Sequence, residues 1–142
     1  MAFATRTIRD TNIATGEGTQ AGYVTVVLDF DADTASDNLA VDGSALSGFA
    51  NGAKIHLTRA WWALLQGTAA SNTGDVELEF KGASSDTTCI RLAGTGHYDG
   101  TAGSIKGNAT NTTATSSDIE AVTRGATGYA ILEFRKDEAY TA

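Results

Sequence analysis

The sequence contains no proline and a single cysteine, Cys89, among its 142 residues. A lone cysteine cannot form a disulfide within the chain and cannot build a cysteine-rich metal cluster. We therefore expect Cys89 to be a buried, inert thiol. Proline commonly stiffens turns, and without it the turns must depend on the 16 glycines and on Asn, Asp and Ser.

Long apolar runs and positive charge are also scarce. No stretch approaches the roughly 20 apolar residues of a membrane-spanning helix, and residues 1–12 lack the basic and apolar layout of a secretory signal. The chain has 10 Lys and Arg against 17 Asp and Glu, a net charge of −7. Such a chain repels the phosphate backbone of nucleic acids. We expect synthesis in the cytoplasm, and neither nucleic acid nor membrane among the partners.

Short stretches of alternating apolar and polar residues are what the sequence does contain. They are separated by clusters of Gly, Asn, Asp and Ser, a pattern typical of antiparallel sandwiches and barrels. The stretches cover residues 5–12, 22–30, 53–62, 74–82, 87–94, 117–124 and 128–136. They predict an all-β fold, an antiparallel β-sandwich of jelly-roll type with about seven or eight strands.

The alternation also predicts which side chains share a face. In 74–82, Val76, Leu78 and Phe80 fall on one parity and should face the core, because successive side chains of a strand point to opposite sides. The stretch 53–62 is the expected partner of this strand.

Two polar segments show no clear alternation. Residues 36–52 are expected to hold one short helical turn over an end of the sandwich. Residues 94–117 are rich in Gly, Thr, Ala, Asn and Ser, and they fit either an ordered loop or an edge strand.

Trp61 and Trp62, the only tryptophans, stand side by side in 53–62. A straight strand would place Trp61 in the core with Ile55 and Leu57, and Trp62 on the outside. A bulge or a strand end would instead let both rings cap the sandwich. An outward ring would belong to a subunit interface, where Trp is enriched, or to a platform for sugar stacking.

Groups suited to catalysis or metal binding are few and scattered. The two histidines, His56 and His97, are far apart in sequence and form no local motif. We therefore expect no enzymatic activity, no catalytic residues and no cofactor. An acidic stretch could form a loose calcium site or only a solvated turn, and it does not match the EF-hand pattern; its carboxylates are Asp29, Asp31, Asp33 and Asp37.

Two sequons, Asn108-Ala-Thr110 and Asn111-Thr-Thr113, match the glycosylation rule. Because the sequence shows no secretory signal, we do not expect either asparagine to be glycosylated.

Four stretches taken in order carry a resemblance to a known group of proteins. They are "IHLTRAWWALL", "GDVELEF", "LAGTGHYDG" and "SDIEAVTRGATGYAILEFRKD". This order of strand patterns, over roughly residues 54–137, resembles small virion structural proteins of tailed bacteriophages.

The resemblance implies a capsid decoration or cement protein without enzymatic activity. Such a protein is made in the host cytoplasm and binds the major capsid protein on the outer shell in many copies. It also implies self-association into a homo-oligomer, for which a trimer is one arrangement. Residues 1–19 would be an N-terminal strand or extended arm that packs on a neighbouring subunit or on the shell, and residues 20–142 the sandwich domain. The expected interface residues are Phe3, Ile8, Ile13, Trp62 and Tyr98.

A carbohydrate-binding sandwich, either lectin-like or a tail-fibre module, is the alternative. In that case Trp62 and Tyr98 would stack on sugar rings, and acidic loop residues would bind hydroxyls or calcium.

Overall fold

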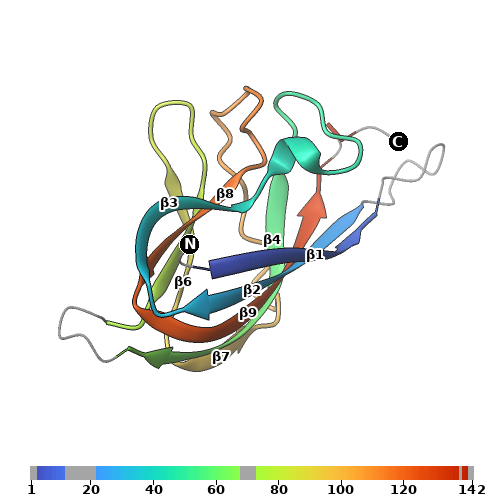
Figure 1. Cartoon of the computed structure of the whole chain (residues 1–142). Helices are drawn as coiled ribbons and strands as arrows, with labels where there is room; N and C mark the ends of the chain where they lie inside the picture. Colours follow the sequence, from blue (N-terminus) through green and yellow to red (C-terminus); the bar gives the residue numbers. More distant parts are fainter. Residues whose placement is uncertain (1–2, 12–21, 68–72, 138, 141–142) are drawn as a thin grey trace.

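The chain folds almost entirely into strands (Figure 1). The computed structural model describes residues 3–11, 22–67, 73–137 and 139–140. Within these ranges there are nine strands and one short 3-10 turn, η1 (Gly43–Ala45). The strands are β1 (Phe3–Asp10), β2 (Tyr23–Asp31), β3 (Thr34–Val41), β4 (Ile55–Gln66), β5 (Val76–Phe80), β6 (Thr87–Leu92), β7 (Thr95–Tyr98), β8 (Ile119–Arg124) and β9 (Ala126–Lys136). The all-β prediction is confirmed, and the helical turn expected in 36–52 is η1.

The strands form two antiparallel sheets with the topology of a jelly roll. One sheet has the order β1-β2-β9-β4-β7 and the other the order β3-β8-β5-β6. Four pairs are nested in the sequence: β5 with β6, β4 with β7, β3 with β8, and β2 with β9. Successive pairs belong alternately to the two sheets, as in a rolled-up jelly roll. The two strands that the sequence did not predict, β3 and β7, come from the polar segments.

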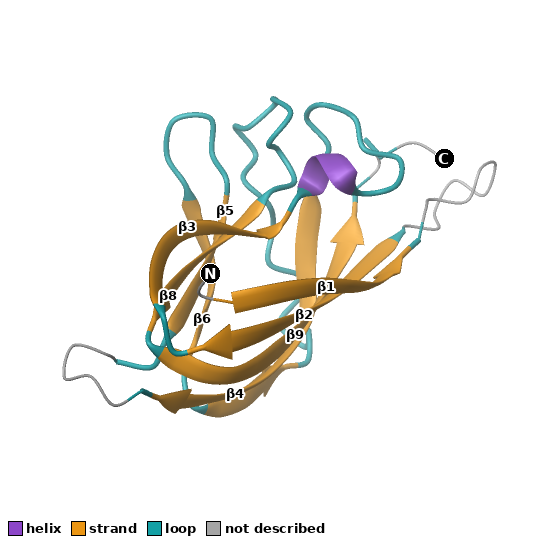
Figure 2. Cartoon of the chain, in the orientation of Figure 1, coloured by secondary structure: helices purple, strands orange, loops and turns teal. Residues whose placement is uncertain are grey.

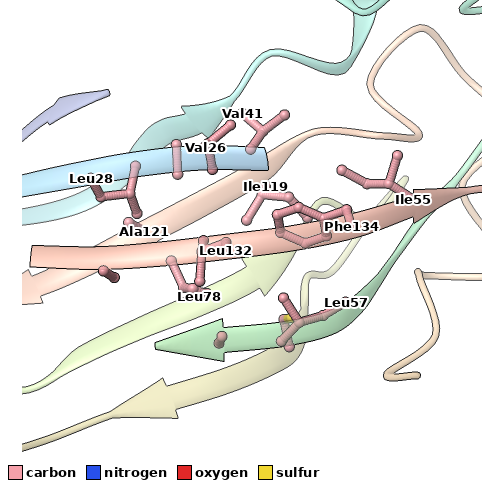
Figure 3. Packing of buried hydrophobic residues seen from close by; sticks show 14 of the residues in the cluster. Val26, Leu28, Val41, Ile55, Leu57, Leu78, Ile119, Ala121, Leu132 and Phe134 are labelled. Atoms are coloured by element: carbon pink, nitrogen blue, oxygen red, sulfur yellow. The ribbon is translucent and has the colours of Figure 1, made fainter. Parts of the chain in front are cut away.

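The core lies between the sheets and is built from the alternating apolar residues (Figure 3). Val76, Leu78 and Phe80 are all buried, as their parity predicted. The predicted partner of β5 is wrong, because β5 pairs with β6 and β8 while β4 belongs to the other sheet. The connection between β4 and β5 therefore carries the chain from one sheet to the other, and does not form a hairpin.

A β-bulge in β4 reverses the predicted positions of the two tryptophans. The register of β4 against β9 shifts between Leu57 and Arg59, so Thr58 is an extra residue. A bulge of one residue exchanges the two faces of the strand beyond it. Trp61 is consequently 38% exposed on the outside, whereas Trp62 packs against the core. The straight-strand prediction is wrong at both positions.

The N-terminal strand β1 is part of the sandwich of its own chain. It pairs with β2 at the edge of the five-stranded sheet, and Figure 1 shows it crossing in front of β2. The Phe3 ring is buried, with its centroid 5.7 Å from that of Phe30. The Thr5 hydroxyl donates to the carbonyl oxygen of Ala40 in β3, at 2.9 Å, and so links the edges of the two sheets. Residues 3–10 thus occupy a position within the sandwich.

Three loops gather at one end of the sandwich, next to η1 (Figure 2). They are the β3–β4, β5–β6 and β7–β8 connections, and hydrogen bonds join them. Asn111 Nδ2 donates to the Lys81 carbonyl at 2.8 Å, and the Ser116 and Ser117 hydroxyls donate to the Ala53 carbonyl. The segment 94–117, for which the sequence left two alternatives, therefore contains both an edge strand and an ordered loop.

The two sequons have a structural role in this loop. Each asparagine Oδ1 accepts hydrogen bonds from the backbone N–H and the hydroxyl of the threonine two residues later. Each Nδ2 donates within the protein, from Asn108 to Ser85 and Thr87, and from Asn111 to Lys81 and Thr115. The repeated Asn-x-Thr pattern thus forms two Asx turns.

Candidate functional site

The outer face of the five-stranded sheet carries a band of apolar side chains, which we call the apolar band. Val27, Ile131 and Trp61 lie opposite one another on β2, β9 and β4. Tyr129 and Ala63 form the next row, and the band continues along β4 to Leu65. Neighbouring strands in a sheet are about 4.8 Å apart, so these side chains form a continuous surface.

The large side chains of this band are exposed to solvent. Leu65 is 73% exposed, Tyr129 43% and Trp61 38%. Single exposed apolar residues are common on protein surfaces, but contiguous patches mark sites of interaction. The apolar band is such a patch.

Glycine at position 128 holds β9 close to β4 just before Tyr129. Gly128 has φ +119°, a region that favours glycine. A Cβ atom there would lie 2.0 Å from the carbonyl oxygen of Ala63. The backbone of β9 therefore fixes the position of Tyr129 within the band.

Charged side chains border the apolar band at its Glu133 side. Glu133 lies 3.6 Å from Arg9 and 3.8 Å from Arg59, and its Oε1 accepts a hydrogen bond from the Thr58 hydroxyl at 2.9 Å. The same threonine donates to the Glu133 carbonyl at 2.9 Å. The bulge residue thus anchors the carboxylate between the two arginines.

The outer face of the four-stranded sheet is different in character. Arg124 is 2.6 Å from Asp75, Arg91 is 3.0 Å from Glu77, and Lys81 is 3.1 Å from Glu120. Hydrogen bonds and these arginines hold the pKa values of Asp75 and Glu77 below their usual range despite the opposing effect of burial. The charged side chains of these three pairs are thus satisfied within the chain.

The expected interface residues do not come together on one surface. Ile8 is 56% exposed at a bulge in β1, whereas Phe3 is in the core and Ile13 lies outside the described residues.

Trp62 lies across Gly96 of β7, and its Nε1 donates to the Ala93 carbonyl at 3.0 Å. Tyr98 also packs against the core, and its hydroxyl donates to the Gly103 carbonyl.

Trp62 and Tyr98 therefore close the edge of the sandwich near β7. Both rings are only partly exposed, because each packs against the core.

The histidines and the cysteine are not placed together in a reactive site. His56 Nδ1 accepts a hydrogen bond from the Gly107 N–H at 2.9 Å, and His97 is exposed opposite Trp61. Cys89 is buried, as predicted, and burial raises the pKa of its thiol. In the described ranges, no group of three or more His, Cys, Asp or Glu residues is placed to hold a metal ion. Nor does any helix in those ranges have the length and apolar character to cross a membrane.

Sequence reasoning missed Trp61, Tyr129 and Ile131 as candidate contact residues. The alternation in 128–136 does place Tyr129 and Ile131 opposite the core residues of β9, so this part of the signal was present. The outward position of Trp61 depends on the bulge at Thr58, which no local pattern reveals.

Comparisons of this chain with protein-family models, with curated proteins and with solved structures found no match.

Proposed function

We propose that this chain is a non-enzymatic structural protein of a virus particle, of the capsid decoration or cement type, which binds the outer shell in many copies. The observation that carries the proposal is the apolar band, in which Val27, Ile131 and Trp61 form one row across an exposed sheet face. The virion context comes from the resemblance of residues 54–137 to phage structural proteins.

The physical basis of this function is repeated burial of protein surface. Many identical copies on a symmetric shell gain avidity, so each contact can be modest. Exposed aromatic rings suit such contacts, because they bury a large area with little loss of side-chain freedom. The net charge of −7 suits a protein that works on the outside of a shell and does not bind the packaged nucleic acid.

The test is to look for the chain in purified particles of the virus that encodes it. Quantitative mass spectrometry should find it in many copies relative to the major capsid protein, and antibody labelling should place it on the outer surface. Shells stripped of the chain should bind it again when it is added back. If washed particles contain no such chain, the proposed function is wrong.

A carbohydrate-binding function is the second candidate, and one observation favours it. Two exposed rings, Trp61 and Tyr129, lie on the same sheet face, with Arg59, Glu133 and His97 around them. Aromatic faces beside hydrogen-bonding groups can stack on sugar rings. The rings concerned differ from Trp62 and Tyr98, which the sequence suggested.

A glycan array followed by fluorescence titration separates the two candidates. A saturable change in emission that disappears in Trp61→Phe would favour sugar binding. Leu39→Thr, on the other sheet, is the matched control, because Leu39 is 42% exposed. An absence of binding across the array would leave the structural function as the better supported one.

A further inference from the structure

We infer that the occupant of the apolar band is a second copy of this chain, so that the outer face of the five-stranded sheet is its self-association surface. This inference rests on the proposed function and names the partner that covers the band. It also gives Trp61, Tyr129 and Ile131 the contact role that the sequence assigned to other residues.

The size of the face is suited to a stable contact between two chains. Five strands about 4.8 Å apart and some nine residues long, at roughly 3.3 Å per residue, give a face of about 20 by 30 Å. That is a flat area on the order of 600 Å², to which the projecting side chains add further surface. A standard interface covers about 800 Å² on each partner. The face thus approaches the area that a specific contact needs.

The distribution of charge favours a copy of the same chain at this face. The strands of the face carry four outward arginines and three outward carboxylates, which leaves a net charge of +1 there and −8 on the rest of the chain. These side chains are Arg6, Arg9, Arg59, Arg135, Asp29, Asp31 and Glu133. Two copies that met through their acidic surfaces would repel each other, because like charges at an interface are unfavourable.

Repulsion between two copies is smallest at the apolar band, because the strands of this face carry a net charge of only +1. Contact there also buries apolar side chains. The outer face of the opposite sheet is less suited to such burial, because it carries the ion pairs of Lys81, Arg91 and Arg124.

The experiment is to measure the solution mass of the full chain by light scattering over a wide range of concentrations. The chain has a mass of 14.6 kDa, and we expect a discrete multiple of this mass. The double variant Trp61→Thr/Tyr129→Thr should be a monomer. The near-ultraviolet circular dichroism of its remaining Trp62 should be unchanged, which shows that the variant is folded. Threonine keeps the preference for strand structure, and both side chains are on the surface.

Leu39→Thr is the matched control, with a similarly exposed apolar residue on the outer face of the other sheet. It should keep the mass of the wild type. A second measurement needs no variant. When the wild type is diluted through the concentration range in which it dissociates, its tryptophan emission should shift to the red and acrylamide should quench it more strongly. The reason is that Trp61 becomes exposed.

A wild-type chain that is monomeric at all concentrations would overturn the inference. So would an oligomer that dissociates in Leu39→Thr and persists in the double variant, or one whose tryptophan emission is unchanged on dissociation. The proposed function is tested separately: a monomer found on particles refutes the inference alone, whereas an oligomer absent from particles refutes the virion role alone.

Discussion

Asn111 illustrates how a polar residue can stabilise a loop-rich end of a small sandwich. Its side chain is fully buried and makes hydrogen bonds to Lys81, Thr113 and Thr115. Buried polar groups cost little when every donor and acceptor is satisfied, and much when one is not. The three loops at this end therefore depend on a few asparagine and serine side chains.

Replacement of this side chain gives the first prediction. Asn111→Ala should lower the free energy of unfolding by about 2–4 kcal/mol, because it leaves buried backbone and hydroxyl groups without partners. Urea denaturation measures the loss. Asn51→Ala, at an exposed loop position, is the control and should change stability by less than about 0.5 kcal/mol. Equal effects of the two substitutions would contradict the role given to Asn111.

Asp118 gives a prediction for the dependence of stability on pH. Burial raises the pKa of this carboxyl, as do Asp42 and Glu120, against the hydrogen bond from the Gly43 N–H at 2.8 Å. A carboxyl with a raised folded-state pKa adds stability below the unfolded value of about 3.9, and this is lost as the pH rises through the folded-state pKa. Asp118→Asn should therefore gain stability relative to the wild type as the pH increases from about 4 towards neutrality.

Chemical denaturation of both proteins at a series of pH values measures this difference. Asp29→Asn, which removes an exposed carboxylate of the five-stranded sheet, is the control for the loss of one negative charge. A difference between Asp118→Asn and the wild type that does not vary with pH would show that Asp118 does not behave in this way.

At the level of elements, β1 is held to the sandwich at both of its ends. Phe3 enters the core at one end. At the other, Asp10 Oδ2 accepts a hydrogen bond from the Ser47 N–H at 2.8 Å, while Oδ1 is 2.5 Å from Lys136 Nζ. Lys136 is fully buried, and its ammonium also donates to the Ser47 carbonyl at 2.7 Å and lies 5.1 Å from the centroid of the Tyr140 ring. An ion pair thus connects the first and last strands.

Removal of Asp10 and removal of Lys136 should lower the free energy of unfolding by different amounts. Asp10→Ala leaves a buried ammonium without its carboxylate and should cost about 3–5 kcal/mol. Lys136→Met should cost less, because Asp10 is partly exposed, can be hydrated and keeps its bond from Ser47. Thermal and urea unfolding of both variants measures the two costs, with Arg6→Ala, on the exposed side of β1, as the control. A smaller cost for Asp10→Ala than for Lys136→Met would contradict this account.

At the level of the whole molecule, the two sheets have different outer faces and the chain has a net charge of −7. The four-stranded sheet carries ion pairs of Arg91 and Arg124 on its outer face, and the five-stranded sheet exposes an apolar band. Association through such a band has to overcome repulsion between acidic copies. Dissolved salt screens this repulsion over distances beyond the Debye length, which is about 10 Å at 0.1 M and about 3 Å at 1 M.

Self-association should therefore become tighter when NaCl is raised from about 0.05 M to about 0.5 M. Sedimentation equilibrium at both salt concentrations measures the dissociation constant. The charge-retaining variant Trp61→Thr/Tyr129→Thr should remain monomeric at both. A dissociation constant that rises tenfold or more with salt would mean that ion pairs, and not the apolar band, hold the copies together.

The sequence by itself determined the all-β class, the core parity of β5 and the acidic charge. These follow from the two-residue repeat of a strand and from composition, both of which are local properties. Only the tertiary structure decided that β5 pairs with β6 and β8, because strand pairing depends on contacts between distant segments. It also decided that Trp61 faces solvent and Trp62 the core, since one extra residue at Thr58 exchanges the faces of β4. The outward positions of Tyr129 and Ile131 in the apolar band could therefore be predicted from the sequence. The outward position of Trp61 could not, because it depends on the bulge.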